Sequence, residues 1–187
     1  MPDRRRLVVT ENISANGVIE FADDWFDPGD QGDAEDLFAV MKEQMAAEEA
    51  LLLGRQTFEE FRGYWPLQTD DASGSADHLN RVRKYVASTT MTDPAWENTT
   101  VLSGRLEDEV AALKATGGGE LGVTGSVSVV HALMRADLVD EYRLFVYPVL
   151  SSRGRNLVPD GLSVRSLQPA GCTAFRNGVV LQVYRRP

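Results

Sequence analysis

The chain has 187 residues, of which 43% are hydrophobic, and this is enough to build one compact core without disulfides or metals. Its 28 acidic and 19 basic residues give a net charge of −9, so its overall field repels nucleic acid and anionic membranes. One cysteine, Cys172, and two distant histidines, His78 and His131, exclude a disulfide framework and a Cys/His zinc site. We therefore expect a single domain, residues 1–187, without a metal centre, in the reducing cytoplasm.

No segment of the sequence is typical of export or of membrane insertion. The basic cluster Arg4–Arg6 precedes an apolar run of only three residues, whereas a signal peptide has about 7 to 15 apolar residues there. No apolar run approaches the roughly 20 residues that span a bilayer. We expect neither a membrane partner nor a nucleic-acid partner.

The first part of the chain alternates short apolar strands with amphipathic helices. Apolar residues at three- and four-residue intervals predict the first helix, and a fully apolar run closed by glycine predicts the buried strand after it. The expected elements are a strand at Leu7–Thr10, a loop at Asn12–Gly17, a loop with two aromatic anchors at Ala22–Asp33, a helix at Ala34–Glu48, a strand at Ala50–Leu53 and a helix at Thr57–Tyr64.

The middle of the chain repeats this alternation. The expected elements are a loop at Gln68–Ala76, a helix at Asp77–Val82, strands at Lys84–Ala87 and Thr99–Leu102, a helix at Leu106–Thr116, a strand at Leu121–Thr124 and a helix at Val127–Arg135. Helices that alternate with short apolar strands predict a largely parallel sheet with helices on both faces.

The last third changes character, because strands follow one another without helices. Glu141–Val149 is a long β-rich run, and Arg176-Asn177-Gly178 separates two further runs at Cys172–Phe175 and Val179–Tyr184. Asn-Gly between β-rich runs is a strong hairpin signal. The sheet is therefore expected to be mixed, with antiparallel strands at its end.

Two strand–glycine–helix junctions are candidate anion sites. At the first, Gly54, Arg55 and Thr57 follow a buried strand; at the second, Gly125 and Ser126 do so. A helix start at the carboxyl end of a strand offers free N–H groups to an anion, and arginine binds phosphate with two donors. A capping serine or an ordinary surface arginine is the alternative at each junction taken alone. Two junctions in one α/β chain favour a ligand, since open sheets bind ligands at this edge.

A third candidate is the strand end at Lys84–Thr90, which carries three consecutive hydroxyls. Ser88, Thr89 and Thr90 could bond a ribose or a phosphate, or satisfy only the backbone of a turn. The sequence has neither a full Gly-x-Gly-x-x-Gly motif nor a Walker lysine, which disfavours an ordinary dinucleotide fold or a nucleoside triphosphatase.

Taken together, these segments resemble the dihydrofolate-reductase-like superfamily, and within it the branch that contains the C-terminal reductase domain of riboflavin-biosynthesis deaminase-reductases. The similarity covers nearly the whole chain. The segments that show this similarity are Leu52–Glu59, Lys84–Thr90, Gly125-Ser126, Ala136–Leu144 and Pro148-Val149. The resemblance implies a three-layer α/β fold in which helices flank a mixed, mainly parallel sheet with a C-terminal antiparallel hairpin.

The resemblance also implies NADPH as the cofactor. The adenosine half and the pyrophosphate would lie along the two junctions and the hydroxyl-bearing strand end, with the 2′-phosphate near Arg55 and Ser88, and the nicotinamide would lie beside the loop after the first strand. The implied cofactor residues are Gly17, Val18, Gly54, Arg55, Thr57, Ser88, Thr89, Thr124, Gly125, Ser126 and Val127.

The substrate implied by the resemblance is a small heterocycle, pterin-like or pyrimidine-like, held between Trp25, Phe26 and the first helix with Phe38. Asn16 replaces an aspartate that is common in this loop of the family. Asn16 and Asp36 are the catalytic candidates: Asn16 would hold a water for protonation, and Asp36 is either a proton donor or a helix N-terminal charge.

Two functions remain open at this point. The first is hydride transfer from NADPH to a C=N or C=O bond of the heterocycle. The second is a nucleotide-binding or interaction module that keeps the fold without the chemistry. Arg153 and Arg155 either meet a substrate phosphate or form a solvated turn. The resemblance further implies a homodimer.

Overall fold

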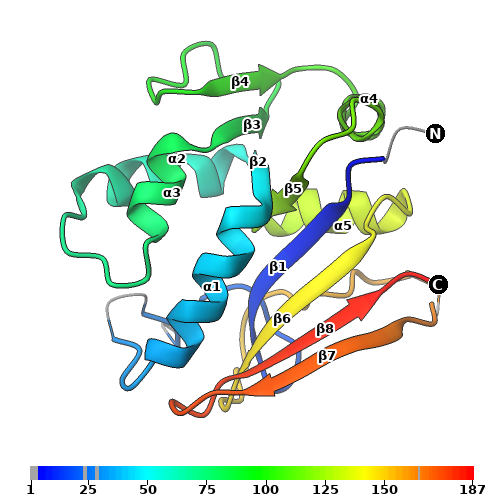
Figure 1. Cartoon of the computed structure of the whole chain (residues 1–187). Helices are drawn as coiled ribbons and strands as arrows, with labels where there is room; N and C mark the ends of the chain where they lie inside the picture. Colours follow the sequence, from blue (N-terminus) through cyan, green and yellow to red (C-terminus); the bar gives the residue numbers. More distant parts are fainter. Residues whose placement is uncertain (1–3, 23–24, 28–29, 164) are drawn as a thin grey trace.

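The computed structural model describes residues 4–22, 25–27, 30–163 and 165–187. Its centre is an eight-stranded sheet with the strand order β4-β3-β2-β5-β1-β6-β8-β7 (Figure 1). The strands are β1 Leu7–Ser14, β2 Glu48–Gly54, β3 Arg83–Ala87, β4 Thr99–Leu102, β5 Glu120–Val123, β6 Glu141–Tyr147, β7 Gln168–Ala174 and β8 Val180–Arg185. Strands β1 to β6 pair in parallel, and β8 pairs antiparallel with both β6 and β7. The predicted mixed sheet with a C-terminal hairpin is confirmed.

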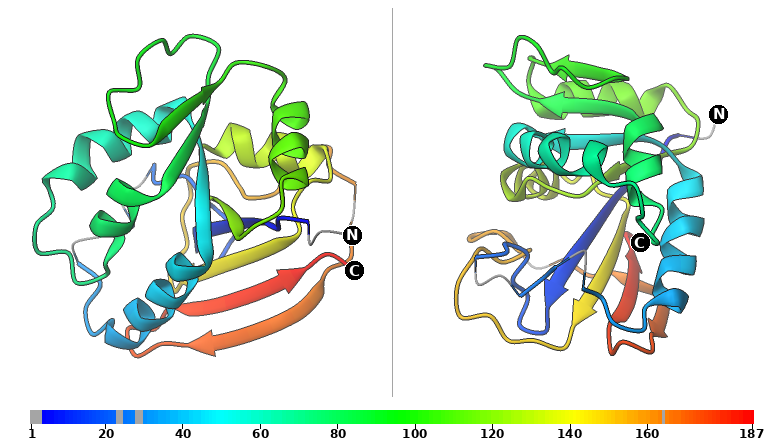
Figure 2. Two further views of the ribbon diagram at one scale, coloured as in Figure 1. Left: turned by 45° about the horizontal axis from the view of Figure 1, so that its top comes forward. Right: turned by 90° about the vertical axis from the view of Figure 1, so that its left-hand side faces the viewer.

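Helices cover both faces of the sheet, which gives three layers (Figure 2). One face carries α1 Glu35–Ala47, α2 Arg55–Tyr64 and α3 Ser75–Arg81, and the other carries α4 Leu106–Ala115 and α5 Val127–Arg135. The α4 and α5 side chains pack with Val9 and Leu52, whereas Phe58 of α2 packs with Leu51 and Leu53. Because side chains alternate along a strand, the neighbours Leu51 and Leu52 serve opposite layers.

Lys84 is fully buried on β3, and its ammonium group replaces the missing backbone partners at the end of α3. The Nζ atom donates to Leu79 O at 2.7 Å and to Val82 O at 2.9 Å, and it lies 4.5 Å from the centre of the Trp96 ring. Burial lowers the pKa of Lys84 from 10.5 to about 8. The lysine thus ties α3 to strand β3.

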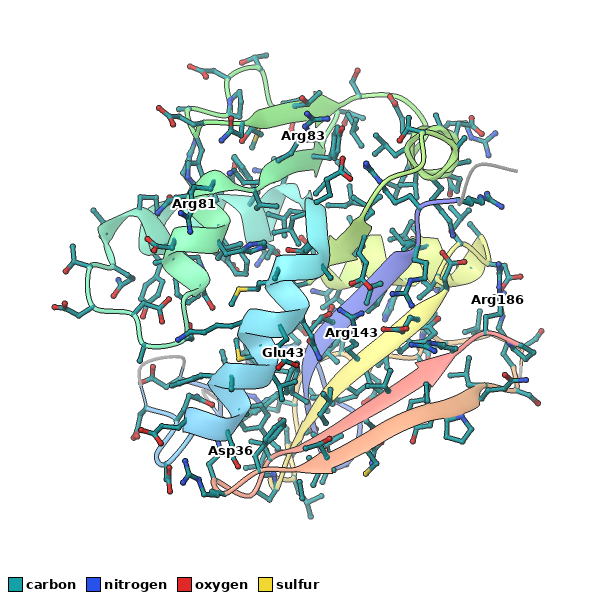
Figure 3. The ribbon with its side chains drawn as sticks, viewed as in Figure 1. Asp36, Glu43, Arg81, Arg83, Arg143 and Arg186 are labelled. Carbon is teal, nitrogen blue, oxygen red and sulfur yellow. The ribbon has the colours of Figure 1, made fainter. Side chains whose placement is uncertain are left out.

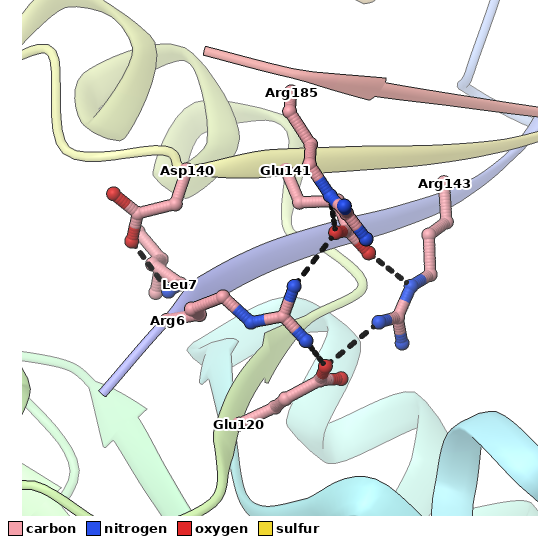
Figure 4. Close-up of polar contacts among 7 residues, drawn as sticks. All are labelled: Arg6, Leu7, Glu120, Asp140, Glu141, Arg143 and Arg185. Carbon is pink, nitrogen blue, oxygen red and sulfur yellow. Dashed lines mark hydrogen bonds and ion pairs between the residues drawn. The ribbon is translucent and has the colours of Figure 1, made fainter. Parts of the chain in front are cut away.

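An ion cluster lies on the α1 face of the sheet, at the amino ends of β1, β5 and β6 (Figures 3 and 4). Glu141, which is almost fully buried, accepts from Arg6 at 3.0 Å, from Arg143 at 2.7 Å and from Arg185 at 2.7 Å. Arg6 and Arg143 also pair with Glu120. Burial opposes ionisation of Glu141, but the bond from Arg185 and the charge of Arg143 hold its pKa below the usual range.

Several element boundaries differ from those predicted. The region predicted as a loop from Asn12 begins only at Ala15, because Asn12–Ser14 continue β1 in parallel pairing with β6. Strand β6 ends at Tyr147 rather than Val149. Other ends move by one to four residues in either direction: β7 begins four residues before the predicted strand, whereas α4 ends one residue before the predicted helix end. Thr124 lies just past β5, and the part of the predicted 22–33 loop at residues 23–24 and 28–29 lies outside the described residues.

Candidate functional site

The two predicted junctions lie side by side at the carboxyl edge of the sheet, because β2 and β5 are neighbours. The backbone N–H of Gly54 donates to Gly125 O at 3.2 Å. The Thr57 hydroxyl donates to Ser126 Oγ at 3.1 Å. The structure therefore brings together residues of two segments about seventy positions apart in one hydrogen-bonded unit.

Both glycines are required by this close approach. A methyl group on Gly54 would overlap Ser126 Oγ and lie 2.8 Å from Ser126 Cβ. Gly125 has a φ of +105°, and a Cβ there would lie 2.9 Å from Thr57 Oγ1. Only glycine adopts this backbone conformation and leaves this space at no steric cost.

Neither helix that starts here is capped by the side chain of its N-cap residue. Ser126 precedes α5, but its hydroxyl makes no capping bond and instead accepts from Thr57. Gly54 precedes α2 and has no side chain to offer. The alternative that Ser126 merely caps its helix is therefore not what the structure has. Ser126 Oγ also accepts from the backbone N–H of Thr57 at 3.4 Å, so it occupies one donor in the first turn of α2. The first turn of α5 and the positive ends of both helix dipoles face the carboxyl edge, where an anion would bind.

A cavity of about 320 Å³ adjoins the start of α2. It is lined by Arg55, Ala87, Ser88, Thr89, Thr90, Leu102, Gly104 and Leu106. The cavity thus collects Arg55, Ser88 and Thr89, three of the predicted cofactor residues. Ser88 Oγ accepts from the backbone N–H groups of Thr90 and Met91, at 3.2 and 3.0 Å, so it also shapes the turn after β3.

Asn16 fastens the loop after β1 to the turn after β6. Its Oδ1 accepts from Ser14 Oγ at 2.8 Å and from Ser151 N at 3.1 Å, and its Nδ2 donates to Ser151 O at 2.8 Å. Gly17, the next residue of the loop, has a φ of +92°, and the side chain of Val18 after it is buried. The Asn16 amide is therefore engaged through both of its polar atoms.

Asp36 lies in the first turn of α1 and is similarly engaged. One carboxylate oxygen accepts from Leu37 N at 3.0 Å, and the other accepts from Arg176 N at 3.1 Å. Arg176 also pairs with Glu35 at 3.1 Å. Phe38 is half-buried and packs against the apolar cluster that contains Phe145. This geometry resembles a helix N-terminal charge more than a free proton donor.

Trp25 and Phe26 belong to an aromatic cluster with Phe21 and Tyr147. The ring centres of Trp25 and Tyr147 lie 5.6 Å apart, and those of Phe21 and Phe26 lie 4.8 Å apart in a stacked pair. The Trp25 Nε1 atom is buried and has no partner among the described residues. Tyr147 donates its hydroxyl to Gln31 at 2.6 Å, and burial raises the pKa of this tyrosine.

Sequence reasoning missed Glu11, which lies on β1 between Val9 and Ile13. Its side chain points into the layer of α4 and α5, and its Oε1 atom has no partner among the described residues. Burial raises the pKa of this carboxyl from 4.5 to about 8. The signal was available, because Glu11 occupies an apolar position of the strand's two-residue alternation.

A larger cavity of about 870 Å³ lies away from these residues, at the amino ends of β2 and β3. Some of its charged side chains pair with one another: His78 with Glu48, and Arg81 with Asp77 at 3.9 Å. Across the described part of the chain there is no cluster of residues that could hold a metal ion. In that same part, every helix is too short or too polar to cross a bilayer.

Residues 6–181 match the family described as the RibD C-terminal domain. The chain belongs to this family. The RibD C-terminal domain family comprises NAD(P)H-dependent reductases. A curated relative, the uncharacterized protein YyaP of Bacillus subtilis (strain 168), is 26% identical over 189 residues, which cover 97% of this chain and 95% of the relative.

Solved structures establish the fold of this RibD C-terminal domain protein. A pyrimidine reductase-like protein of Corynebacterium diphtheriae superposes with a TM-score of 0.68 at 15% identity, covering 98% of this chain and 92% of the other. Dihydrofolate reductase of Enterococcus faecalis, complexed with NADP(H) and RAB-propyl, superposes with a TM-score of 0.64 at 18% identity, covering 100% and 99%. The predicted dihydrofolate-reductase-like fold is confirmed.

Proposed function

We propose that this protein is an NADPH-dependent reductase that transfers a hydride to a C=N or C=O bond of a pterin-like or pyrimidine-like molecule. The observation that carries the proposal is the pair of locked junctions, Gly54–Thr57 and Gly125–Ser126, together with the cavity at the start of α2 that Arg55 lines. Membership of a reductase family supports the chemistry.

The residues of both junctions fit a dinucleotide. In this proposal the first turn of α5, from Val127, binds the pyrophosphate, with Gly125 and Thr124 beneath it. Arg55 and Ser88 bind the 2′-phosphate with charged and neutral donors. When bound, NADPH supplies the hydride, and Gly17 and Val18 orient the ring that carries it. The protein itself contributes by positioning the cofactor and the substrate.

The aromatic cluster around Trp25 is the proposed substrate side. Its rings would stack on a planar heterocycle, with Phe38 and the start of α1 behind them, and the unpartnered Trp25 Nε1 would donate to a ring oxygen or nitrogen. Asn16 and Asp36 would act by positioning, because their polar atoms are already bonded. Arg155 is held by Glu20 at 2.6 Å, which favours a substrate without a phosphate there.

Cofactor binding is tested first, by titrating the protein with NADPH and following nicotinamide fluorescence. We expect saturable NADPH binding that Arg55→Met weakens. Arg81→Met, at an exposed arginine that does not line the cavity of Arg55, should leave NADPH binding unchanged. Loss of NADPH absorbance with dihydropterins, dihydrofolate and aminouracils then tests the reaction. Absence of NADPH binding at high micromolar cofactor would refute the proposal.

A second function, a nucleotide-binding module without reductase activity, is favoured by one observation. Both catalytic candidates, Asn16 and Asp36, have their polar atoms engaged in structural bonds. Saturable NADPH binding combined with no oxidation of the cofactor by any substrate in the panel would select this alternative.

We also propose a homodimer formed through the late strands. All seven residues of β7 are exposed, and along the described chain this strand pairs with β8 alone. Light scattering coupled to gel filtration measures the mass in solution, and a monomer at micromolar concentration would contradict this assembly.

A further inference from the structure

The cavity beside α2 contains one basic side chain among the described residues that line it, Arg55, and a carboxylate lies against that side chain. Arg55 Nη1 is 3.2 Å from both carboxylate oxygens of Glu59, one helical turn further along α2. We propose that Glu59 is a specificity-determining residue, which lowers the affinity of this cavity for a 2′-phosphate and so limits its preference for NADPH over NADH. This inference rests on the proposed cofactor site.

The pair is weak enough to be displaced or shared. Both side chains are about half-exposed, at 53% for Arg55 and 41% for Glu59, and exposed pairs at this helical spacing contribute little stability. Only the Nη1 atom of Arg55 bonds to Glu59 in the described structure. The Nε and Nη2 donors of Arg55 are therefore available to a phosphate while Glu59 keeps its place.

Charge repulsion follows from that arrangement. A phosphate monoester that binds to Arg55 carries nearly two negative charges, and the Glu59 carboxylate would lie a few ångströms from it. An unphosphorylated ribose hydroxyl carries no charge for the same carboxylate to repel. Glu59 thus discriminates against the ligand that Arg55 attracts, and the two residues set the preference jointly.

The remaining charges near the cavity do not offset Glu59. The Glu109 carboxylate accepts from the backbone N–H of Gly104, a lining residue, at 3.2 Å. Arg105, the neighbouring base, is directed to Asp108 at 3.5 Å. A 2′-phosphate in the cavity therefore meets one basic side chain, Arg55, which is paired with Glu59, while a second carboxylate, Glu109, lies at the lining residue Gly104.

The test uses two ligands that differ only in the 2′-phosphate: adenosine 2′,5′-bisphosphate and adenosine 5′-monophosphate. Calorimetric titration of the full chain gives their dissociation constants for wild type, Glu59→Gln and Glu60→Gln. Glu60 is the matched control, because its substitution removes the same charge from the next residue of α2, where it bonds Gln56 rather than Arg55.

At low salt we expect Glu59→Gln to lower the dissociation constant of the bisphosphate by about threefold to tenfold. The dissociation constant of the monophosphate should stay within about twofold of its wild-type value. This gain should shrink at high salt, where exposed charges are screened. In Glu60→Gln, the dissociation constants of both ligands should stay within about twofold of the wild-type values. An unchanged or weaker bisphosphate affinity in Glu59→Gln would show that Glu59 does not oppose the phosphate or that it positions Arg55, and either result overturns the inference. A wild-type protein that binds neither ligand overturns the cofactor site itself.

Discussion

Gly54 and Ser126 touch across the boundary between β2 and β5, where a methyl group on Gly54 would lie 2.8 Å from Ser126 Cβ. We therefore predict that Gly54→Ala lowers the free energy of unfolding by about 1 to 3 kcal/mol and weakens NADPH binding. Chemical denaturation and cofactor titration measure the two effects. The double variant Gly54→Ala/Ser126→Gly should regain part of the lost stability.

Gly63→Ala is the control for this experiment. Gly63 lies in α2, and a Cβ there would have no atom within 4 Å. Alanine should stabilise the helix by roughly 0.5 to 1 kcal/mol without affecting the cofactor. Equal behaviour of the two glycine variants would contradict the role assigned to Gly54.

Glu11 should make the protein less stable as the pH rises. Its folded-state pKa of about 8 exceeds the ordinary value of 4.5, so the folded chain keeps a proton that the unfolded chain releases between these pH values. Stability from this group is complete below pH 4.5 and is lost as the pH approaches 8, by roughly 1.4 kcal/mol per pKa unit. Glu11→Gln should remove this fall.

Urea denaturation of wild type and Glu11→Gln across that range measures the difference. Glu43→Gln, at an exposed position of α1, is the matched control and should follow the wild-type curve. Parallel curves for wild type and Glu11→Gln would mean that Glu11 has an ordinary pKa.

Lys84 should make the protein more stable as the pH rises, in a higher pH range than the effect of Glu11. Its folded-state pKa of about 8 is below 10.5, so the unfolded chain binds the extra proton between these values and stability rises with pH. Lys84→Met should lack this rise, so its deficit relative to wild type should grow from pH 8 to 10.5. Lys42→Met, at an exposed lysine, serves as the control in thermal unfolding at each pH.

Asn16→Asp should loosen the loop even though it restores the residue common in the family. A carboxylate cannot donate to Ser151 O, so that carbonyl loses the bond from Asn16 and faces a negative charge. We expect a stability loss of about 1 to 3 kcal/mol and a higher KM for NADPH. Hydrogen exchange at Val18, whose N–H donates to Ser14 Oγ, reports the loosening. Unchanged exchange at Val18 would count against this clamp.

The order of strands and helices could be predicted because most elements carry a periodic apolar pattern of their own. The position of both junctions at the carboxyl edge of the sheet also followed, since parallel strands end at one edge. The bond between Thr57 and Ser126 did not follow, because it depends on β2 lying next to β5, a pairing of distant segments that no local pattern specifies. The extension of β1 through Ser14 was missed for the same reason: β6 supplies its partners.

The sequence also could not predict that the polar atoms of both catalytic candidates are already hydrogen-bonded. Asn16 meets Ser151, which is 135 positions away, and Asp36 meets Arg176, which is 140 positions away. Residue type alone suggests a titrating or water-holding group at such positions. Tertiary partners decide whether the group is available.

Three of the strands that carry candidate-site residues at their carboxyl ends, β1, β5 and β6, carry the cluster of Arg6, Glu120, Glu141 and Arg143 at their amino ends. Anchoring and the proposed ligand recognition thus lie at opposite ends of these three strands. The recognition end can change residue by residue over evolution, or in the hands of an engineer, while the anchoring end keeps β1, β5 and β6 in register.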